Sequence, residues 1–310
     1  MTDVNGSEPV AYARCVTNPL KIWLRSGRMD SLVAASMPVI SSLALAWKDM
    51  SVRGDKFLVV PAVCCFFFAV LAQIAANLIN DYSDYRTGAN VAIRENNERN
   101  VGITQRSLLI GGIAAFCCAV LFGLATIPFG GVKIIVTGLV LGAICLLYSV
   151  GPFPFSEWGL GDVAVIMTFG MSSVIFTYFL QTGGFSPQTL LLGFVFGMAI
   201  NNILVANNYA DYAEDKSVKK YTTVVLFGEN FGRLLYISEG FFGAAALAVL
   251  YTLRGCWGVF AVLSIVLYLA MHLRASATFL RPGFDKLVGL AQAGMNVVLL
   301  GVLVPLAILF

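Results

Sequence analysis

The chain has 310 residues, of which 58% are apolar and 12% are charged, and its formal net charge is +3. Soluble domains carry roughly 25% charged residues, so this composition predicts a protein whose solvent is a lipid bilayer. The basic residues lie in loops between apolar stretches and form no stripe of the kind that binds nucleic acid. The seven cysteines show no C-x-x-C spacing, which argues against a disulfide framework or a thiolate metal site.

Residues 1–28 are polar and mixed in charge, and no apolar core precedes a small-residue cleavage site, so they do not resemble a signal peptide. We expect a cytosolic tail with an interfacial segment around residues 22–24. The rest of the chain, residues 29–310, is expected to form a single transmembrane domain.

A membrane-spanning helix needs roughly 20 mostly apolar residues. About nine windows approach this length, which predicts an all-α, multi-pass bundle around a central cavity. The first window is short and contains Asp30 and Pro38. The windows cover residues 29–47, 57–80, 108–127, 132–150, 161–180, 188–209, 234–252, 256–273 and 287–309.

The distribution of basic residues predicts the orientation of this bundle. Cytoplasmic loops of membrane proteins carry an excess of Lys and Arg. With nine spans, the amino-terminal side receives most of the 20 basic residues, and the other side receives only Lys48, Arg53, Lys56, Lys133 and Arg254. We therefore expect a multi-pass protein of the cell membrane, with the long loops 81–106 and 210–233 in the cytoplasm.

Acidic and amide side chains mark the helix ends that enter these two loops. Asn77 and Asp81 are four residues apart, as are Asn80 and Asp84, and residues with this spacing share one helix face. The sixth window ends in a similar way, with the four-residue steps Asn207, Asp211 and Asp215.

The recurrence of Asn-x-x-x-Asp suggests a pseudo-repeat whose halves carry the motifs 77–88 and 207–216 and face each other across the cavity. Hard oxygen ligands suit Mg²⁺, which commonly joins carboxylates to substrate phosphates. The predicted metal ligands are Asn77, Asp81, Asp84, Asn207, Asp211 and Asp215. The simpler interpretation is that these acids only solvate helix ends, but two matched ladders on one face favour a metal site.

A diphosphate bound at such a site needs cations as well as the metal. Arg and Lys side chains pair with diphosphate oxygens, and the two loops supply several of them. Each of these basic residues is also explained by the excess of Lys and Arg in cytoplasmic loops alone. The candidates for diphosphate binding are Arg86, Lys216, Lys220 and Arg94, of which Arg86 and Lys216 lie beside an acidic ladder.

These segments resemble the two Asp-rich motifs of the UbiA superfamily of intramembrane prenyltransferases, helical proteins with nine spans and active sites that face the cytoplasm. The resemblance covers nearly the whole chain. Within the superfamily the pattern is similar to that of the 1,4-dihydroxy-2-naphthoate polyprenyltransferases of menaquinone biosynthesis. The matching residues are Asn80, Asp81, Tyr82, Asp84 and Gly88, then Gly102 to Gln105, Leu147, Tyr148, Gly151 and Pro152, then Gly159 to Asp162, Phe169 and Gly170, and finally Asn207, Asn208, Asp211, Asp215, Lys220 and Thr222.

Two positions depart from that pattern. The subfamily commonly has a further acid where this chain has Asn90, and an arginine where this chain has Ala210. The first departure concerns the metal ligands and the second concerns the phosphate or acceptor contacts. The identity of the acceptor therefore follows less directly from the motifs than the type of reaction does.

The resemblance implies transfer of a polyprenyl group from prenyl diphosphate to 1,4-dihydroxy-2-naphthoate, with loss of CO₂, to give demethylmenaquinone. Mg²⁺ would neutralise the diphosphate, and Asp81, Asp84, Asp211 and Asp215 are the expected catalytic residues. The expected partners are the two substrates and the lipid bilayer, without nucleic acid. Nothing in the sequence indicates an oligomeric state.

Two alternatives stay open. The same fold could prenylate another acceptor, such as 4-hydroxybenzoate, homogentisate, a chlorophyllide or a glycerol phosphate lipid. An ion-coupled transporter would also bind a cation near a pseudo-symmetric interface. Against the transporter, the acids lie at helix ends instead of the midplane, and helices broken by Gly or Pro are not paired between the halves.

Overall fold

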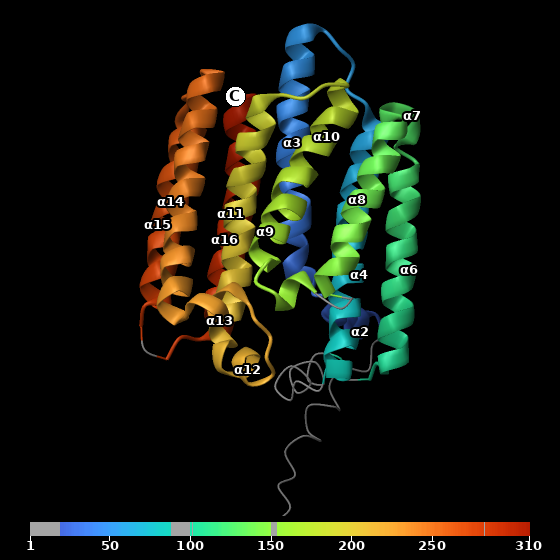
Figure 1. The fold of residues 1–310 in the computed structure, drawn as a ribbon. Coiled ribbons are helices and arrows are strands. Elements are labelled where there is room, and N and C mark those ends of the chain that lie inside the picture. The colour runs from blue at the N-terminus through green and yellow to red at the C-terminus, as the bar shows by residue number, and fades with distance from the viewer. Residues whose placement is uncertain (1–18, 88–99, 101, 150–153, 282) are drawn as a thin grey trace, which may run out of the picture.

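The computed structural model, shown in Figure 1, describes residues 19–87, 100, 102–149, 154–281 and 283–310. Its regular secondary structure over these residues is entirely helical, which confirms the all-α prediction. The helices are α2 (Pro19–Ser26), α3 (Leu32–Arg53), α4 (Val59–Thr87), α6 (Gln105–Leu124), α7 (Ile127–Gly130), α8 (Val132–Ser149), α9 (Gly161–Val165), α10 (Ser173–Thr182), α11 (Pro187–Ala210), α12 (Tyr212–Ser217), α13 (Thr223–Phe227), α14 (Glu229–Arg254), α15 (Val259–Phe279) and α16 (Lys286–Leu309).

Seven helical segments in the described part of the chain are long and apolar enough to cross a membrane. They comprise α4, α6 with α7, α9 with α10, α11, α14, α15 and α16. The other two predicted windows correspond to α3, which carries three charged residues near its end, and to the shorter apolar helix α8. The protein is thus an integral membrane protein, while the predicted number of about nine spans is not confirmed.

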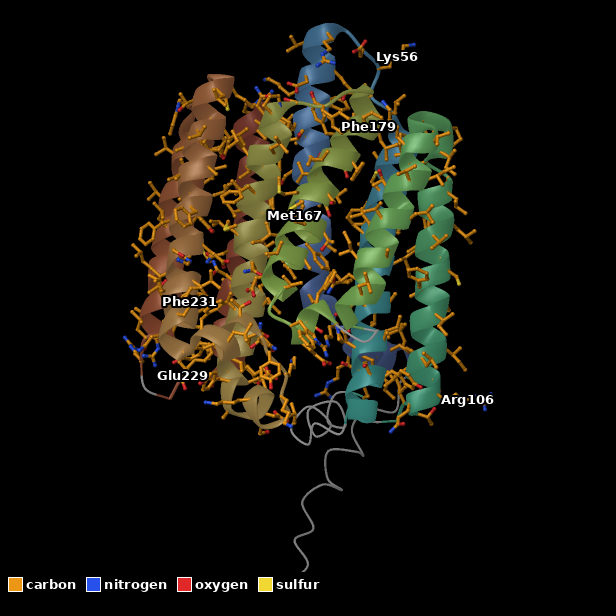
Figure 2. The ribbon with its side chains drawn as sticks, in the orientation of Figure 1. Lys56, Arg106, Met167, Phe179, Glu229 and Phe231 are labelled. Carbon is orange, nitrogen blue, oxygen red and sulfur yellow. The ribbon has the colours of Figure 1, made fainter. Side chains whose placement is uncertain are left out.

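The outer faces of the bundle are apolar. Leu121 on α6 and Val132 and Leu139 on α8 are each at least 65% exposed, as expected of side chains that contact lipid. In Figure 2, Lys56 lies at one end of the bundle, and Arg106 and Glu229 lie at the other end. The labelled charges thus lie at the ends, where headgroups and water would meet them.

Helix α11 is the central element of the fold, and 72% of its apolar 18-residue window is buried inside the protein. It packs against α14, α16 and α10, and a large apolar cluster joins it to α3 and α15. On the other side of α3, helices α4, α6 and α8 form a second group, as Figure 1 shows.

A π-helical segment, Ile166–Ser172, links α9 to α10 and crosses α11 at very close range. A Cβ atom added to Gly170 would lie 2.5 Å from the carbonyl oxygen of Gly193 and from backbone atoms of Gly197. Small residues allow membrane helices to approach this closely. The three glycines therefore fix how the π-helical segment sits on the central helix.

A polar cluster holds the bundle together at the end that carries Lys56. Asp49 on α3 accepts a hydrogen bond of 2.7 Å from the Tyr178 hydroxyl of α10 and pairs with Arg254 of α14, also at 2.7 Å. Lys48 donates to the carbonyl of Leu309, near the end of α16. Four helices are thereby joined at this end.

Candidate active site

Both Asp-rich segments lie at the same end of the bundle. Figure 1 shows the carboxyl end of α4 and the short helix α12 at the lower end, together with α2 and α13. The first motif occupies the last turns of α4, and the second runs from the end of α11 through α12. This arrangement agrees with the prediction that the two loops share one face.

In the first motif, Asp81 is fully enclosed by the protein. Its side chain is 0% exposed, and it forms an ion pair with the guanidinium group of Arg28. Asn100 donates to its other oxygen at 2.9 Å. A buried carboxylate needs partners of this kind, because an unpaired charge away from water is very costly.

Asn77 holds the segment that carries Arg28. Its side-chain nitrogen donates to the carbonyl of Gly27 at 3.0 Å and to the hydroxyl of Ser31 at 2.8 Å, while its oxygen accepts from Gln73 at 3.1 Å. Arg28 itself has a φ of +50°, a left-handed conformation that is uncommon outside glycine. The predicted ligand Asn77 thus fixes the backbone that directs Arg28 toward Asp81.

In the second motif, Asp211 caps the end of α11. The ammonium group of Lys286, at the start of α16, donates to both of its oxygens at 2.9 Å. Asn207, one turn earlier, donates to the same carboxylate at 3.2 Å. Asp211 and Asn207 therefore share one helix face, as their spacing predicts.

Asp215 lies one turn further along, in α12, and is buried. Lys220 donates to its Oδ1 at 3.2 Å, whereas its Oδ2 has no hydrogen-bond partner in the described structure. Burial raises the pKa of Asp215 to about 6, although the nearby Lys220 acts in the opposite direction. An orphaned buried carboxylate oxygen is a group that a bound cation would satisfy.

The remaining predicted residues fall into two groups. Asp84 and Arg86 belong to the last turns of α4, but their side chains lie outside the described residues, as does the whole of Arg94. Lys216 is exposed and lies over the ring of Tyr212, with 5.4 Å between its Nζ and the ring centre. Of the predicted cations, the described structure brings Lys220 to an acid.

Sequence reasoning did not single out three polar residues that contact the acids. Arg28 and Lys286 fall on the predicted cytoplasmic side, where topology alone accounts for them, and Asn100 lies in the first loop. Position gives one signal for the first two, because Arg28 directly precedes the apolar window 29–47 and Lys286 directly precedes the apolar window 287–309. No pattern in the sequence distinguishes Asn100.

The donor set suits Mg²⁺ in its chemistry. The six predicted ligands offer carboxylate and amide oxygens, which are the ligands of hard divalent cations. Among the described residues, no three His, Cys, Asp or Glu side chains form one metal-binding group. Asp81, Asp211 and Asp215 instead each have a basic partner, and the partnerless Oδ2 of Asp215 offers a direct position for a cation.

Comparison with known proteins identifies the family. Residues 35–300 match the UbiA prenyltransferase family. The chain is 30% identical to the 1,4-dihydroxy-2-naphthoate octaprenyltransferase of Escherichia coli over 76% of this chain and 79% of that protein. It is 27% identical to the enzyme of the same name from Bacillus subtilis, over 65% of this chain and 64% of that one.

A solved structure shares the fold. The structure of a UbiA homolog from Archaeoglobus fulgidus bound to GPP and Mg²⁺ superposes with a TM-score of 0.64, over 93% of this chain and 99% of that chain, at 14% sequence identity. With the helical bundle and the two acidic helix ends on one face, these findings show that the chain belongs to the UbiA prenyltransferase family and is a membrane-embedded prenyltransferase.

Proposed function

We propose that this enzyme transfers a polyprenyl group from prenyl diphosphate to 1,4-dihydroxy-2-naphthoate in a Mg²⁺-dependent reaction. The observation that carries the proposal is the set of three acids at one end of the bundle, each held by a basic side chain. The names of the bacterial relatives support this acceptor.

The predicted metal ligands are Asp81, Asp84, Asp211 and Asp215, with Asn77 and Asn207 in support. Mg²⁺ bound there would supply positive charge that stabilises the departing diphosphate. The basic partners Arg28, Lys286 and Lys220 lie against three of these acids. In this proposal they bind diphosphate oxygens beside the metal ligands, and their contacts with the acids support that role.

In the proposed reaction the allylic C–O bond breaks, and diphosphate leaves with the electron pair. The ring carbon that bears the carboxylate forms the new C–C bond with the prenyl carbon. The carboxylate then leaves as CO₂, and its electron pair restores the aromatic ring. The product is the quinol form of demethylmenaquinone, and because CO₂ leaves in place of a proton, this substitution needs no general base.

The proposal also covers orientation. The Asp-rich end would face the cytoplasm of a cell whose plasma membrane holds the enzyme, because most basic residues lie on that side. Residues 29–310 would act as one domain, with the motifs 77–88 and 207–216 as its two half-sites.

The test uses purified protein in detergent with Mg²⁺, a long-chain prenyl diphosphate, and either 1,4-dihydroxy-2-naphthoate or 4-hydroxybenzoate. We expect CO₂ and a prenylated naphthalene product from the first acceptor, and loss of both in the Asp81→Ala and Asp211→Ala variants. Asp55→Ala is the matched control, because Asp55 is an exposed acid that follows α3, at the end of the bundle that carries Lys56.

Other outcomes would change the assignment. Transfer to 4-hydroxybenzoate alone would keep the reaction type and replace the acceptor. Diphosphate release without prenylation of either compound would direct the search to other acceptors. Absence of turnover, together with cation-dependent uptake into proteoliposomes, would favour an ion-coupled transporter.

A further inference from the structure

Asn100 lies against Asp81 and has one polar atom without a partner. Its side-chain nitrogen donates to Oδ2 of Asp81 at 2.9 Å, and Asn100 is 3% exposed. A carboxylate that is paired with an arginine only accepts hydrogen bonds, so the amide nitrogen must face Asp81 and the amide oxygen must face away. That oxygen is buried and accepts no hydrogen bond in the described structure. A buried acceptor of this kind calls for a donor or a cation.

Arg28 presents the complementary atom at the other oxygen of Asp81. Its guanidinium group donates to Oδ1, while its Nε, which is also a donor, is buried and has no partner among the described residues. The two partners of Asp81 thus each keep one unmet polar atom, an acceptor on Asn100 and a donor on Arg28. Mg²⁺ bound to diphosphate offers both complements, because the metal and its waters satisfy an amide oxygen and a phosphate oxygen satisfies a guanidinium nitrogen.

A turn before α6 holds Asn100 in this position. The amide of Ile103 donates to the carbonyl oxygen of Asn100 at 2.9 Å, and Gly102 between them has a φ of +89°, which favours glycine. The Thr104 hydroxyl then accepts from the amide of Ser107 at 3.1 Å and caps α6. Figure 1 shows the start of α6 beside the end of α4, against which it packs. The turn therefore fixes Asn100 next to the first Asp-rich motif.

The simpler role for Asn100 is to stabilise the buried carboxylate of Asp81. That role uses the amide nitrogen alone. It leaves the amide oxygen buried and unmet, which is destabilising. An asparagine at this position is therefore explained better if its oxygen also contacts a ligand of the site.

We propose that the side-chain oxygen of Asn100 contacts the Mg²⁺ ion that Asp81 binds, or a water on that ion, while its nitrogen orients Asp81. Mg²⁺ keeps several waters in such sites, so either contact recognises the same ion. The inference rests on the proposed function, because it takes Asp81 as a metal ligand. It adds to the metal site a residue that lies outside both Asp-rich motifs.

The first experiment measures how Mg²⁺, added with inorganic diphosphate, raises the unfolding temperature of the purified full-length enzyme. Asn100→Leu removes the amide, so the Mg²⁺ concentration that gives half of the rise should increase about tenfold, as for residues that support metal ligands. Asn296→Leu is the matched control. Asn296 is 1% exposed, and both of its amide atoms lack a hydrogen-bond partner in the part of the chain that the structure describes. Its replacement should leave the required Mg²⁺ concentration unchanged.

Asn100→Asp separates the role of the oxygen from that of the nitrogen. Aspartate keeps an oxygen at this position but loses the donor and places a second negative charge beside Asp81. Without Mg²⁺ the two acids repel each other, and the unfolding temperature should fall. With Mg²⁺ we expect a larger rise, and a lower Mg²⁺ requirement, than in Asn100→Leu. If the nitrogen alone mattered, aspartate would be at least as harmful as leucine at every Mg²⁺ concentration.

Gly102→Ala tests the turn without changing Asn100. Alanine is strained at a φ of +89°, so the turn should shift and the Mg²⁺ requirement should rise. Gly183→Ala is the control, because Gly183 at the end of α10 has a φ of +68° and nothing within 4 Å of its added Cβ. It should lower the unfolding temperature and leave the Mg²⁺ requirement unchanged.

The inference is overturned if Asn100→Leu needs no more Mg²⁺ than the unmodified enzyme, or if Asn100→Asp needs as much as Asn100→Leu. Should Asn100→Leu fail to fold, Asn100→Asp and the two glycine variants decide the question. The proposed function is judged separately. A Mg²⁺ response that depends on Asn100, without transfer to 1,4-dihydroxy-2-naphthoate, would keep the inference and remove the acceptor. Transfer to that acceptor with a Mg²⁺ response that ignores Asn100 would do the reverse.

Discussion

The ammonium group of Lys286 lies 2.9 Å from both carboxylate oxygens of Asp211 and joins the start of α16 to the end of α11. A symmetric contact of this kind fixes the carboxylate plane. It also places a positive charge next to an acid that is predicted to bind Mg²⁺. The second half of the site therefore depends on a helix that begins 75 residues after that acid.

Replacing Lys286 tests whether this cation contributes to substrate binding. Lys286→Met should raise the KM for prenyl diphosphate about tenfold, since a hydrogen bond to a charged group contributes about 1.5–3 kcal/mol. The KM for the aromatic acceptor should change much less. Lys219→Met is the control, because Lys219 is an exposed lysine of the same region; an equal effect in both variants would contradict a specific role for Lys286.

Arg28 and Asp81 allow stability to be separated from activity. Arg28→Met removes the ion pair between Arg28 and the fully buried Asp81, and we expect a loss of about 2 kcal/mol in unfolding free energy. This is less than the 3–5 kcal/mol typical of a buried pair, because the Arg28 side chain is 32% exposed. Thermal unfolding in detergent measures the change.

The double variant Arg28→Met with Asp81→Asn supplies the control for that experiment. It removes both charges, so stability should recover to near that of the unmodified enzyme, while prenyl transfer should be lost because Asp81 is a predicted metal ligand. Recovery of activity as well would show that Asp81 is needed only for structure, which would contradict its assignment as a metal ligand.

At the opposite end of the bundle, Asp49 is expected to matter for stability alone. Asp49→Asn weakens the contacts with Tyr178 and Arg254 and should lower the unfolding free energy by about 2 kcal/mol. Tyr178→Phe removes one hydrogen bond and should cost about 1 kcal/mol. Neither variant should change the KM for Mg²⁺; a change would indicate coupling between the two ends.

Gly170 tests the close contact between the π-helical segment and α11. Gly170→Ala should destabilise the protein by more than about 2 kcal/mol, because its methyl group would meet backbone atoms that cannot move aside. Gly138→Ala on α8 is the matched control, because nothing lies within 4 Å of its added Cβ. Equal unfolding temperatures for the two variants would show that the crossing can adjust.

Much of this protein follows from local sequence. Apolar windows of sufficient length predict membrane helices because the bilayer leaves the backbone few alternatives. The four-residue steps in Asn77 to Asp81 and in Asn207 to Asp211 predict shared helix faces, because the helical repeat is fixed. The placement of both motifs at one end is predicted by the even number of apolar windows that the sequence places between them.

Only the tertiary structure decided which side chains meet. Arg28 lies 53 residues before Asp81, and Lys286 lies 75 residues after Asp211. Asn201 likewise donates to both Asp162 and Glu239, which no local repeat relates. Helix periodicity determines the face on which a residue lies, but helix packing determines what that face touches. The acids of the candidate site could therefore be predicted from the sequence, whereas most of their partners could not.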